Sequence, residues 1–284
     1  VATRVPVHAS GPYRMPAYAA EARAVHTHGP VSGAFRGFGV PQAMLLSETL
    51  MDRLAETAGI DALEFRLRNA LRAGDETATG QHLAAPGIHE CLIALRPHWQ
   101  RALVEAQAPG RGVGLATCWY GCGNTSLPNP STMRLGLTRA GVPVLHQGAT
   151  DIGQGSNTVI PQIAAEALGL PLAAFRLIGP DTALTPDAGK TSASRQTFVS
   201  GRAAQASGAA LRAEILRRLN LGQGARLALE GATLTGTENG QTARLSLAAL
   251  PEDPFGYVLM AEESYDPPTT ALDENGQGIP YAVY

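Results

Sequence analysis

The spacing of apolar residues along the chain predicts several amphipathic helices. Over 41–58, apolar residues recur at the spacing of a helix, at Met44, Met51, Leu54, Ala55 and Ala58. Asp61 precedes the next apolar-periodic stretch and is a candidate N-cap, because its side chain can accept hydrogen bonds from the first free N–H groups of a helix. Further helices are predicted over 61–73, 89–106, 159–168 and 198–219.

Shorter runs of apolar and β-branched residues, bounded by turn residues, predict strands. Strands and helices mix without a strict βαβ repeat, so the predicted class is α+β, with two subdomains. A polar stretch rich in Gly and Thr over 74–87 predicts the boundary, which divides the chain into residues 1–86 and 87–284. The predicted strands are 20–28, 112–121, 132–141, 142–151, 175–181, 226–236 and 256–266.

Composition narrows the class of protein. The chain is 44% hydrophobic, enough to build a sizeable core, and its net charge of -2 does not favour nucleic-acid binding. Three cysteines argue against a disulfide framework, and no apolar run is long enough to span a membrane, so we expect a cytoplasmic protein. The chain begins at Val1 and ends abruptly at Tyr284, and we expect it to be a fragment of a longer protein.

Three polar or glycine-rich loops each run into a predicted helix: 33–39, 148–155 and 189–194. A helix N-terminus presents unpaired N–H groups and a positive dipole end, so such loops are candidate anion sites. Arg36 can add a planar cation, and Thr191, Ser192 and Ser194 can add hydroxyl groups. Neither the dinucleotide-binding pattern nor the P-loop pattern fits, so the residues alone indicate an anion-binding globular protein.

Three longer strings then carry a resemblance. GAFRGFGVPQ, GATDIGQGSNT and KTSASRQTFVSGRA occur in this order. Together they resemble the molybdopterin-binding large subunit of the xanthine dehydrogenase and aldehyde oxidoreductase family of molybdenum hydroxylases. The resemblance runs from about Arg4 to Tyr284. It implies that 1–86 is the C-terminal part of a first molybdopterin-binding domain and 87–284 most of a second.

The resemblance also implies a cofactor site. The cofactor of this family is molybdenum bound by the dithiolene of a pyranopterin, often extended by a cytosine dinucleotide. Arg36 and Ala193 would lie next to the metal without ligating it. The residues implied for cofactor binding are Ala34, Phe35 and Arg36, then Gly153, Gln154 and Gly155, and then Thr191, Ser192, Ala193 and Ser194.

Four further residues are implied to contact the substrate. Phe38 would stack on a flat substrate, although an aromatic residue beside glycines can instead belong to the core. Arg4 falls where some purine-oxidising members place a substrate-binding arginine. Asn124 and Thr125 fall in a pocket-wall loop, where purine-oxidising relatives tend to have an aromatic residue in place of Asn124. The substrate therefore stays open between an N-heterocycle and an aldehyde.

The implied reaction is hydroxylation with oxygen from water, with electrons passing to [2Fe-2S] centres and FAD on partner chains or segments. The family's glutamate base lies in a Gly-Glu motif, which we expect beyond Tyr284. No catalytic residue is therefore assigned in this chain, and the isolated 284 residues are expected to be inactive.

Purely structural roles for several of these residues, and other classes of function for the chain, also remain open. Arg36 can be a structural arginine that binds loop carbonyls, Gln154 can cap a helix, and Cys122 can be a buried inert thiol. Lys190, within GKTS, is interpreted as a solvated loop lysine. Two other classes of function stay open: a non-catalytic structural or assembly fragment, and a nucleotide-phosphate-binding transferase that uses GKTS.

Overall fold

The computed structural model describes residues 4–30, 33, 35–123, 127–269, 271, 274 and 282–283. Contacts divide the chain into two compact units: unit 1 is Val1–Cys122 with Leu272–Tyr284, and unit 2 is Gly123–Ala271. This division follows contacts within the chain, whereas the boundary near residue 86 concerns the two cofactor-binding domains and stays a prediction. Within the described part of the chain, no helix has the length and apolar character needed to cross a bilayer.

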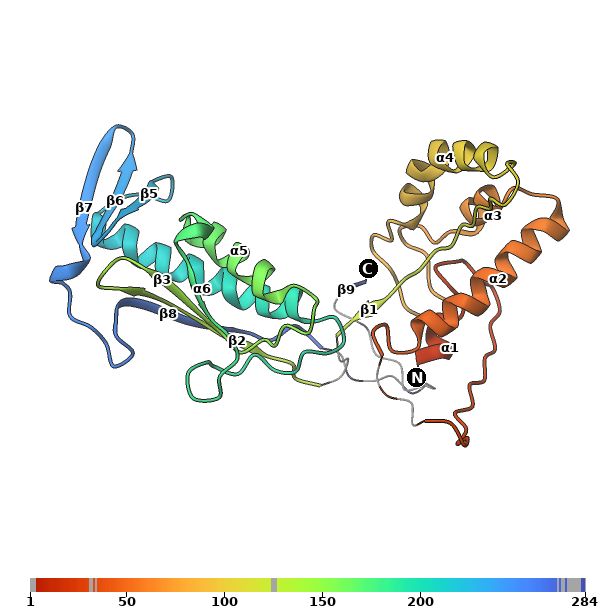
Figure 1. The fold of residues 1–284 in the computed structure, drawn as a ribbon, viewed down its shortest axis with the longest axis horizontal. Helices are drawn as coiled ribbons and strands as arrows, with labels where there is room; N and C mark the ends of the chain where they lie inside the picture. The colour runs from red at the N-terminus through yellow and green to blue at the C-terminus, as the bar shows by residue number, and fades with distance from the viewer. Residues whose placement is uncertain are drawn as a thin grey trace. The chain divides into compact units, whose positions relative to one another are not determined.

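Unit 1 is mainly helical (Figure 1). Its main helix α2 begins one residue before Pro41, whose fixed φ suits a first turn, and ends at Gly59 in the left-handed region. Asp61 caps the next helix as predicted, because its side chain accepts from the N–H groups of Leu63 and Glu64. The elements are α1 (Arg4–His8), α2 (Val40–Ala58), α3 (Ala62–Asn69), α4 (Ile88–Glu105), and β1 (Gly121–Cys122) paired antiparallel with β9 (Ala282–Val283).

A buried ion pair connects three parts of unit 1. The carboxylate of Glu48 on α2 accepts from Arg66 Nε on α3 at 2.9 Å. It also accepts from the hydroxyl of Tyr13 at 2.8 Å and from the backbone N–H of Thr117 at 2.9 Å. Because Arg66 is fully buried and Glu48 nearly so, the chain on either side of these residues is fixed to the helices. The stretch that leads from Thr117 into β1 is one of the segments held in this way.

Unit 2 is a four-stranded sheet in the order β4-β3-β2-β8, with α5 and α6 packed on one face (Figure 1). The two helices approach closely, because a Cβ on Gly208 of α6 would lie 2.8 Å from the carbonyl oxygen of Ala164 on α5. A separate antiparallel sheet has the order β5-β6-β7. The elements are β2 (Ser131–Thr138), β3 (Pro143–Gln147), α5 (Ser156–Leu168), β4 (Arg176–Ile178), α6 (Gln196–Leu219), β5 (Arg226–Glu230), β6 (Thr233–Glu238), β7 (Gln241–Ser246) and β8 (Tyr257–Tyr265), with short 3₁₀ turns at Leu172–Ala174 and Leu247–Ala249.

The predicted α+β class is confirmed, but three strand predictions were wrong in detail. Residues 20–28 form no strand: their side chains are mostly exposed, and a strand needs a hydrogen-bonded neighbour. The predicted strand 112–121 contains regular pairing only where β1 meets β9. The predicted single strand 226–236 is a hairpin, since Gly231 turns the chain at a φ of 55° between β5 and β6.

Candidate active site

The first glycine-rich loop leads directly into α2, as predicted. Phe35 and Arg36 are exposed, and the N–H of Phe38 donates to the carbonyl of Phe35 at 2.8 Å. Phe38 has a φ of 49°, between two glycines that also have positive φ, and its side chain is 41% exposed. A bulky residue in the left-handed region is uncommon and tends to mark function. The side chain of Phe38 is therefore not part of the hydrophobic core. Ala34, the other predicted residue of this loop, is not among the residues that the structure describes.

The second loop, before α5, is organised around Asp151. Its carboxylate accepts from the backbone N–H groups of Gly153 at 2.8 Å, Asn157 at 2.9 Å and Gly155 at 3.3 Å. The hydrogen bonds from Asn157 and Gly153 lower the pKa of Asp151, because they stabilise its charged form. Gln154 holds the loop as well, since its Nε2 donates to the carbonyl of Thr150 at 2.9 Å. The loop thus already contains an anion of its own, which the sequence interpretation missed.

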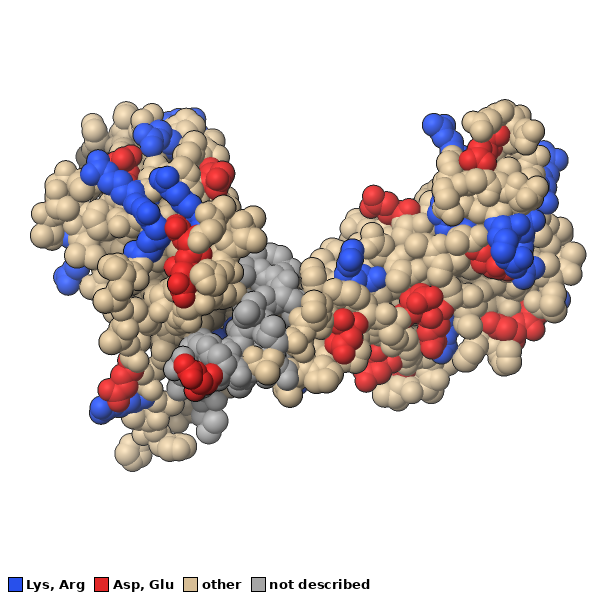
Figure 2. All heavy atoms as spheres, turned by 180° about the vertical axis from the view of Figure 1, so that it is seen from behind, with Lys and Arg blue, Asp and Glu red and all other residues tan. Residues whose placement is uncertain are grey.

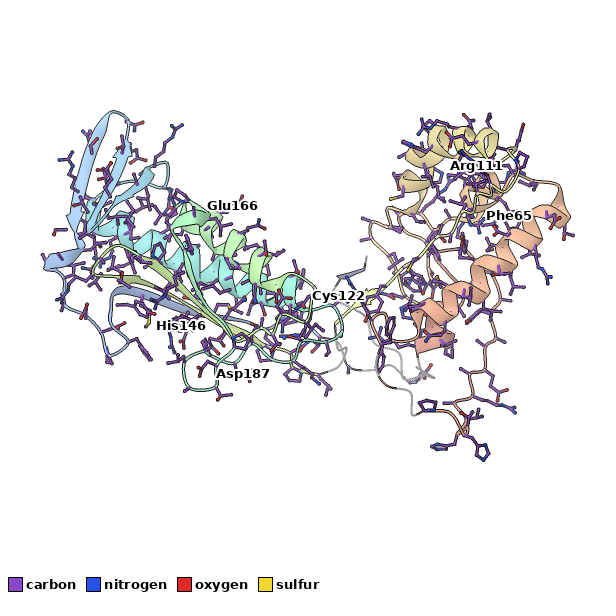
Figure 3. All side chains as sticks on the ribbon, in the orientation of Figure 1. Phe65, Arg111, Cys122, His146, Glu166 and Asp187 are labelled. Atoms are coloured by element: carbon purple, nitrogen blue, oxygen red, sulfur yellow. The ribbon has the colours of Figure 1, made fainter. Side chains whose placement is uncertain are left out.

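The third loop, 188–194, precedes α6 and contains two consecutive non-glycine residues with positive φ, Ala193 at 54° and Ser194 at 56°. Such backbone costs on the order of 1–3 kcal/mol per residue and persists where its surroundings impose it. Successive N–H groups around a change from left- to right-handed backbone, as at Ser194 and Arg195, form concavities that suit anions. Asp187, labelled in Figure 3, begins the turn by accepting from the N–H of Gly189 at 2.7 Å.

The second and third loops are joined in unit 2. The hydroxyl of Thr191 donates to the carbonyl of Thr150 at 3.0 Å. Ser192 is exposed and Ala193 half-buried, so small side chains line this part of the loop. The structure therefore brings 153–155 and 191–194 together within one unit, whereas Phe35, Arg36 and Phe38 belong to unit 1.

Arg4, a predicted substrate residue, lies in an aromatic cluster of unit 1. Its guanidinium is 5.6 Å from the centre of the Tyr120 ring. His8 packs against Trp119 and Tyr120, with ring centres 5.1 and 6.1 Å away, and burial lowers the pKa of His8. The buried Nε1 of Trp119 has no hydrogen-bond partner in the described part of the chain. The sequence analysis did not single out this cluster. The signal that could have located it is the pair of adjacent aromatic residues, Trp119 and Tyr120, shortly before the predicted pocket-wall loop.

Other predicted positions have simpler outcomes. Asn124 and Thr125 lie outside the described residues. Cys122, labelled in Figure 3, is fully buried, as the interpretation of an inert thiol requires. Lys190 is exposed. Among the described residues, no three His, Cys, Asp or Glu side chains gather closely enough to hold a metal ion.

These residues fit a phosphate-bearing organic cofactor. In unit 2, the loops at 150–155 and 188–194 offer hydroxyls and small side chains, with strained backbone at Ala193 and Ser194. Such a set suits a ligand held by many polar contacts.

Comparison with known proteins identifies the family. Two protein-family models, each described as a molybdopterin cofactor-binding domain, match this chain, one over residues 93–284 and the other over residues 1–70. The chain belongs to the molybdopterin cofactor-binding domains of the xanthine dehydrogenase and aldehyde oxidoreductase family. The resemblance found in the sequence is thereby confirmed.

Individual relatives agree. The chain is 36% identical over 210 residues to the xanthine dehydrogenase molybdenum-binding subunit of Escherichia coli, which covers 70% of this chain and 28% of the relative. It is 37% identical over 199 residues to the aldehyde oxidoreductase of Megalodesulfovibrio gigas, which covers 67% of this chain and 22% of the relative. The solved aldehyde oxidoreductase from Desulfovibrio desulfuricans aligns at a TM-score of 0.66 with 27% identity, covering 88% of this chain and 26% of that one. The chain thus spans about a quarter of the length of these relatives.

Proposed function

We propose that this chain is the cofactor-binding part of a molybdenum hydroxylase that inserts oxygen from water into a carbon of an N-heterocycle or an aldehyde. Substrate C–H and water then give C–OH, protons and a pair of electrons. The observation that carries the proposal is family membership together with two hydrogen-bonded loops that are joined at Thr191 and Thr150, one of which is strained at Ala193 and Ser194.

The proposed cofactor contacts follow the loops. Gly153, Gln154 and Gly155 would contact the pterin and its phosphate from one side. Thr191, Ser192, Ala193 and Ser194 would contact it from the other, while Ala34, Phe35 and Arg36 would approach the metal end. Since the hydroxyl hydrogen of Thr191 is already donated to Thr150, its contact with a phosphate would use its backbone N–H.

The chain's own residues would bind and orient. When bound, the molybdenum cofactor supplies the activation of water-derived oxygen and accepts the electrons. Arg36 would place a permanent positive charge near the reacting centre, and Ala193, having a small side chain, would leave room for the metal. Gly153 and Ser194 contribute to loops fixed by hydrogen bonds before the ligand arrives, so little ordering remains to be done on binding.

The substrate contacts are proposed on the aromatic cluster. The guanidinium of Arg4 above Tyr120 and the exposed ring of Phe38 suit a flat ring that carries negative charge or electron-rich atoms. Asn124 and Thr125 would complete the wall. This set favours an N-heterocycle over a small aldehyde, because a small aldehyde offers no ring to stack.

The remaining features concern the whole protein. We infer that the cofactor is molybdenum–molybdopterin, with the cytosine dinucleotide form as one alternative, that [2Fe-2S] and FAD centres on partner chains or segments take up the electrons, and that the complex is cytoplasmic. The glutamate base would come from outside these residues. On the face that Figure 2 shows, acidic and basic side chains are interspersed over both units, which does not favour a nucleic-acid partner.

The test is turnover by the full-length protein purified with its partners. A nicotinate-like heterocycle and an aromatic aldehyde are each supplied in water labelled with heavy oxygen, with a dye as electron acceptor. The proposal expects labelled hydroxylated product from one of them. No product from either, together with magnesium-dependent ATP binding, would contradict it in favour of a transferase that uses Lys190 and Thr191.

A further inference from the structure

Two side chains at the N-terminus of α6, those of the N-cap Arg195 and the first residue Gln196, hold the neighbouring loops, and neither is among the cofactor contacts proposed above. We propose that Arg195 and Gln196 are positioning residues: they fix the backbone of 188–194 and connect it to Thr150 of the other loop. This inference rests on the proposed function, because it takes these loops to be the cofactor-binding ones.

Arg195 binds two stretches of backbone at once. Its side chain is fully buried. Its Nη1 donates to the carbonyls of Ala188 at 2.5 Å and Lys190 at 3.3 Å, and its Nη2 donates to those of Asn129 at 2.6 Å and Pro130 at 2.7 Å. Because the guanidinium is planar and its donors have fixed directions, this set of bonds locks the two stretches against each other.

The chain makes room for this contact at Gly189. A Cβ at this position would lie 2.8 Å from Nη1 of Arg195 and 2.9 Å from the carbonyl oxygen of Pro130. Its φ of 65° is also one that other residues rarely adopt. The loop therefore passes the guanidinium as closely as a glycine allows, and the strained pair Ala193 and Ser194 follows within five residues.

Gln196 makes the second connection. Its Nε2 donates to the hydroxyl oxygen of Thr191 at 3.2 Å, and that hydroxyl donates to the carbonyl of Thr150 at 3.0 Å. Its Oε1 accepts from Ser200, whose hydroxyl lies 2.8 Å from that of Ser131 on β2. The chain of hydrogen bonds thus runs from the buried strand through α6 to both loops, which fixes the direction of the Thr191 hydroxyl.

The experiment compares Arg195, the N-cap of α6, with an arginine inside that helix. Arg212 also donates hydrogen bonds to backbone carbonyls, but none of these carbonyls belongs to the two loops. They are the carbonyls of Leu168 at 3.2 Å, Gln223 at 3.2 Å and Ala225 at 2.5 Å. Arg195→Lys and the matched control Arg212→Lys are made in the full-length protein. The readouts are hydrogen exchange of peptides covering 185–194 and 148–155, compared with β2, and the molybdenum and pterin content per subunit.

We expect Arg195→Lys to speed exchange in 185–194 and to lower cofactor content, each by about tenfold or more, because a lysine cannot reach four carbonyls in a fork. Arg212→Lys should leave both readouts unchanged. Thr191→Val, a smaller change, should speed exchange in 148–155 as well as in 185–194, and it serves as the test where Arg195→Lys fails to fold.

Two results would overturn the inference. The first is unchanged hydrogen exchange of the loops in Arg195→Lys, or in Thr191→Val where Arg195→Lys fails to fold. The second is an equal effect of Arg195→Lys and Arg212→Lys, which would mean that Arg195 contributes only to general stability. A wild-type protein without molybdenum or pterin would instead overturn the proposed function and the cofactor part of this inference. The exchange of the two loops would still decide whether Arg195 and Gln196 hold them.

Discussion

The buried ion pair of unit 1 gives the sharpest stability prediction. Glu48→Gln preserves the shape of the side chain but removes its charge. One carboxylate oxygen accepts from the hydroxyls of Tyr13 and Thr117 at 2.8 and 2.9 Å, and the other from Arg66 Nε and the Thr117 N–H, both at 2.9 Å. An amide nitrogen in the second position would bring two N–H donors against a donor, whereas in the first position it would face two hydroxyls that can turn to accept. In either case Arg66 loses the charge of its partner.

The size of the stability loss depends on the ion pair that Arg66 still makes after the substitution. Breaking a buried ion pair costs about 3–5 kcal/mol, because the remaining charge is left without compensation. Arg66 retains an ion pair with Asp52 at 2.8 Å, and the Asp52 side chain is half exposed. We therefore expect Glu48→Gln to lower the free energy of unfolding by about 3 kcal/mol, at the lower end of that range. Tyr13→Phe, which removes one hydrogen bond, should cost about 1 kcal/mol.

The assay is urea unfolding followed by tryptophan fluorescence. Both tryptophans of the chain, Trp99 and Trp119, belong to unit 1, so the signal reports the unfolding of that unit. A double-mutant cycle of Glu48→Met and Arg66→Met should show coupling of about 2 kcal/mol. A Glu48→Gln protein within about 0.5 kcal/mol of wild type would refute the reasoning.

Three further predictions concern single side chains. Asp61→Ala removes the N-cap of α3 and the acceptor for Trp99 Nε1 at 2.8 Å, and it should cost about 2 kcal/mol by the same fluorescence assay; Asp61→Asn, which keeps an acceptor, should cost less than half of that. Burial lowers the pKa of His146, so the unfolded chain binds a proton more readily and stability should fall as the pH drops below about 6.5. In circular dichroism melts, His146→Gln should flatten this pH dependence of the melting temperature. Parallel pH curves for the variant and the wild type would count against the prediction. Asp151→Asn should speed amide exchange across 153–157 at neutral pH, whereas unchanged exchange would show that the carboxylate does not order the loop.

The sequence was informative where the signal is local. Pro41 and Asp61 mark helix starts because a fixed φ and a capping carboxylate act within one turn, and both helices begin there. The three glycine-rich loops precede α2, α5 and α6, as predicted. The resemblance, carried by long strings in a fixed order, identified the family.

The missed features depend on residues far apart in the chain. β1 pairs with β9, about 160 residues later, so the apolar pattern of 112–121 contains no trace of its partner. Arginine is rarely buried, and nothing in the local pattern distinguishes Arg195 from the exposed arginines. Asp151 was overlooked because its partners are backbone N–H groups, which every sequence supplies.

The most direct test of the central claim is the molybdenum content of the native, full-length protein, recovered with its partners from cells given ample molybdate and measured by mass spectrometry. The account predicts about one molybdenum per subunit, with iron alongside, since one pterin site is formed by the loops of one chain. Iron without molybdenum, or neither metal, would mean that the loops before α5 and α6 bind another anion and that the likeness to the family extends to the fold alone.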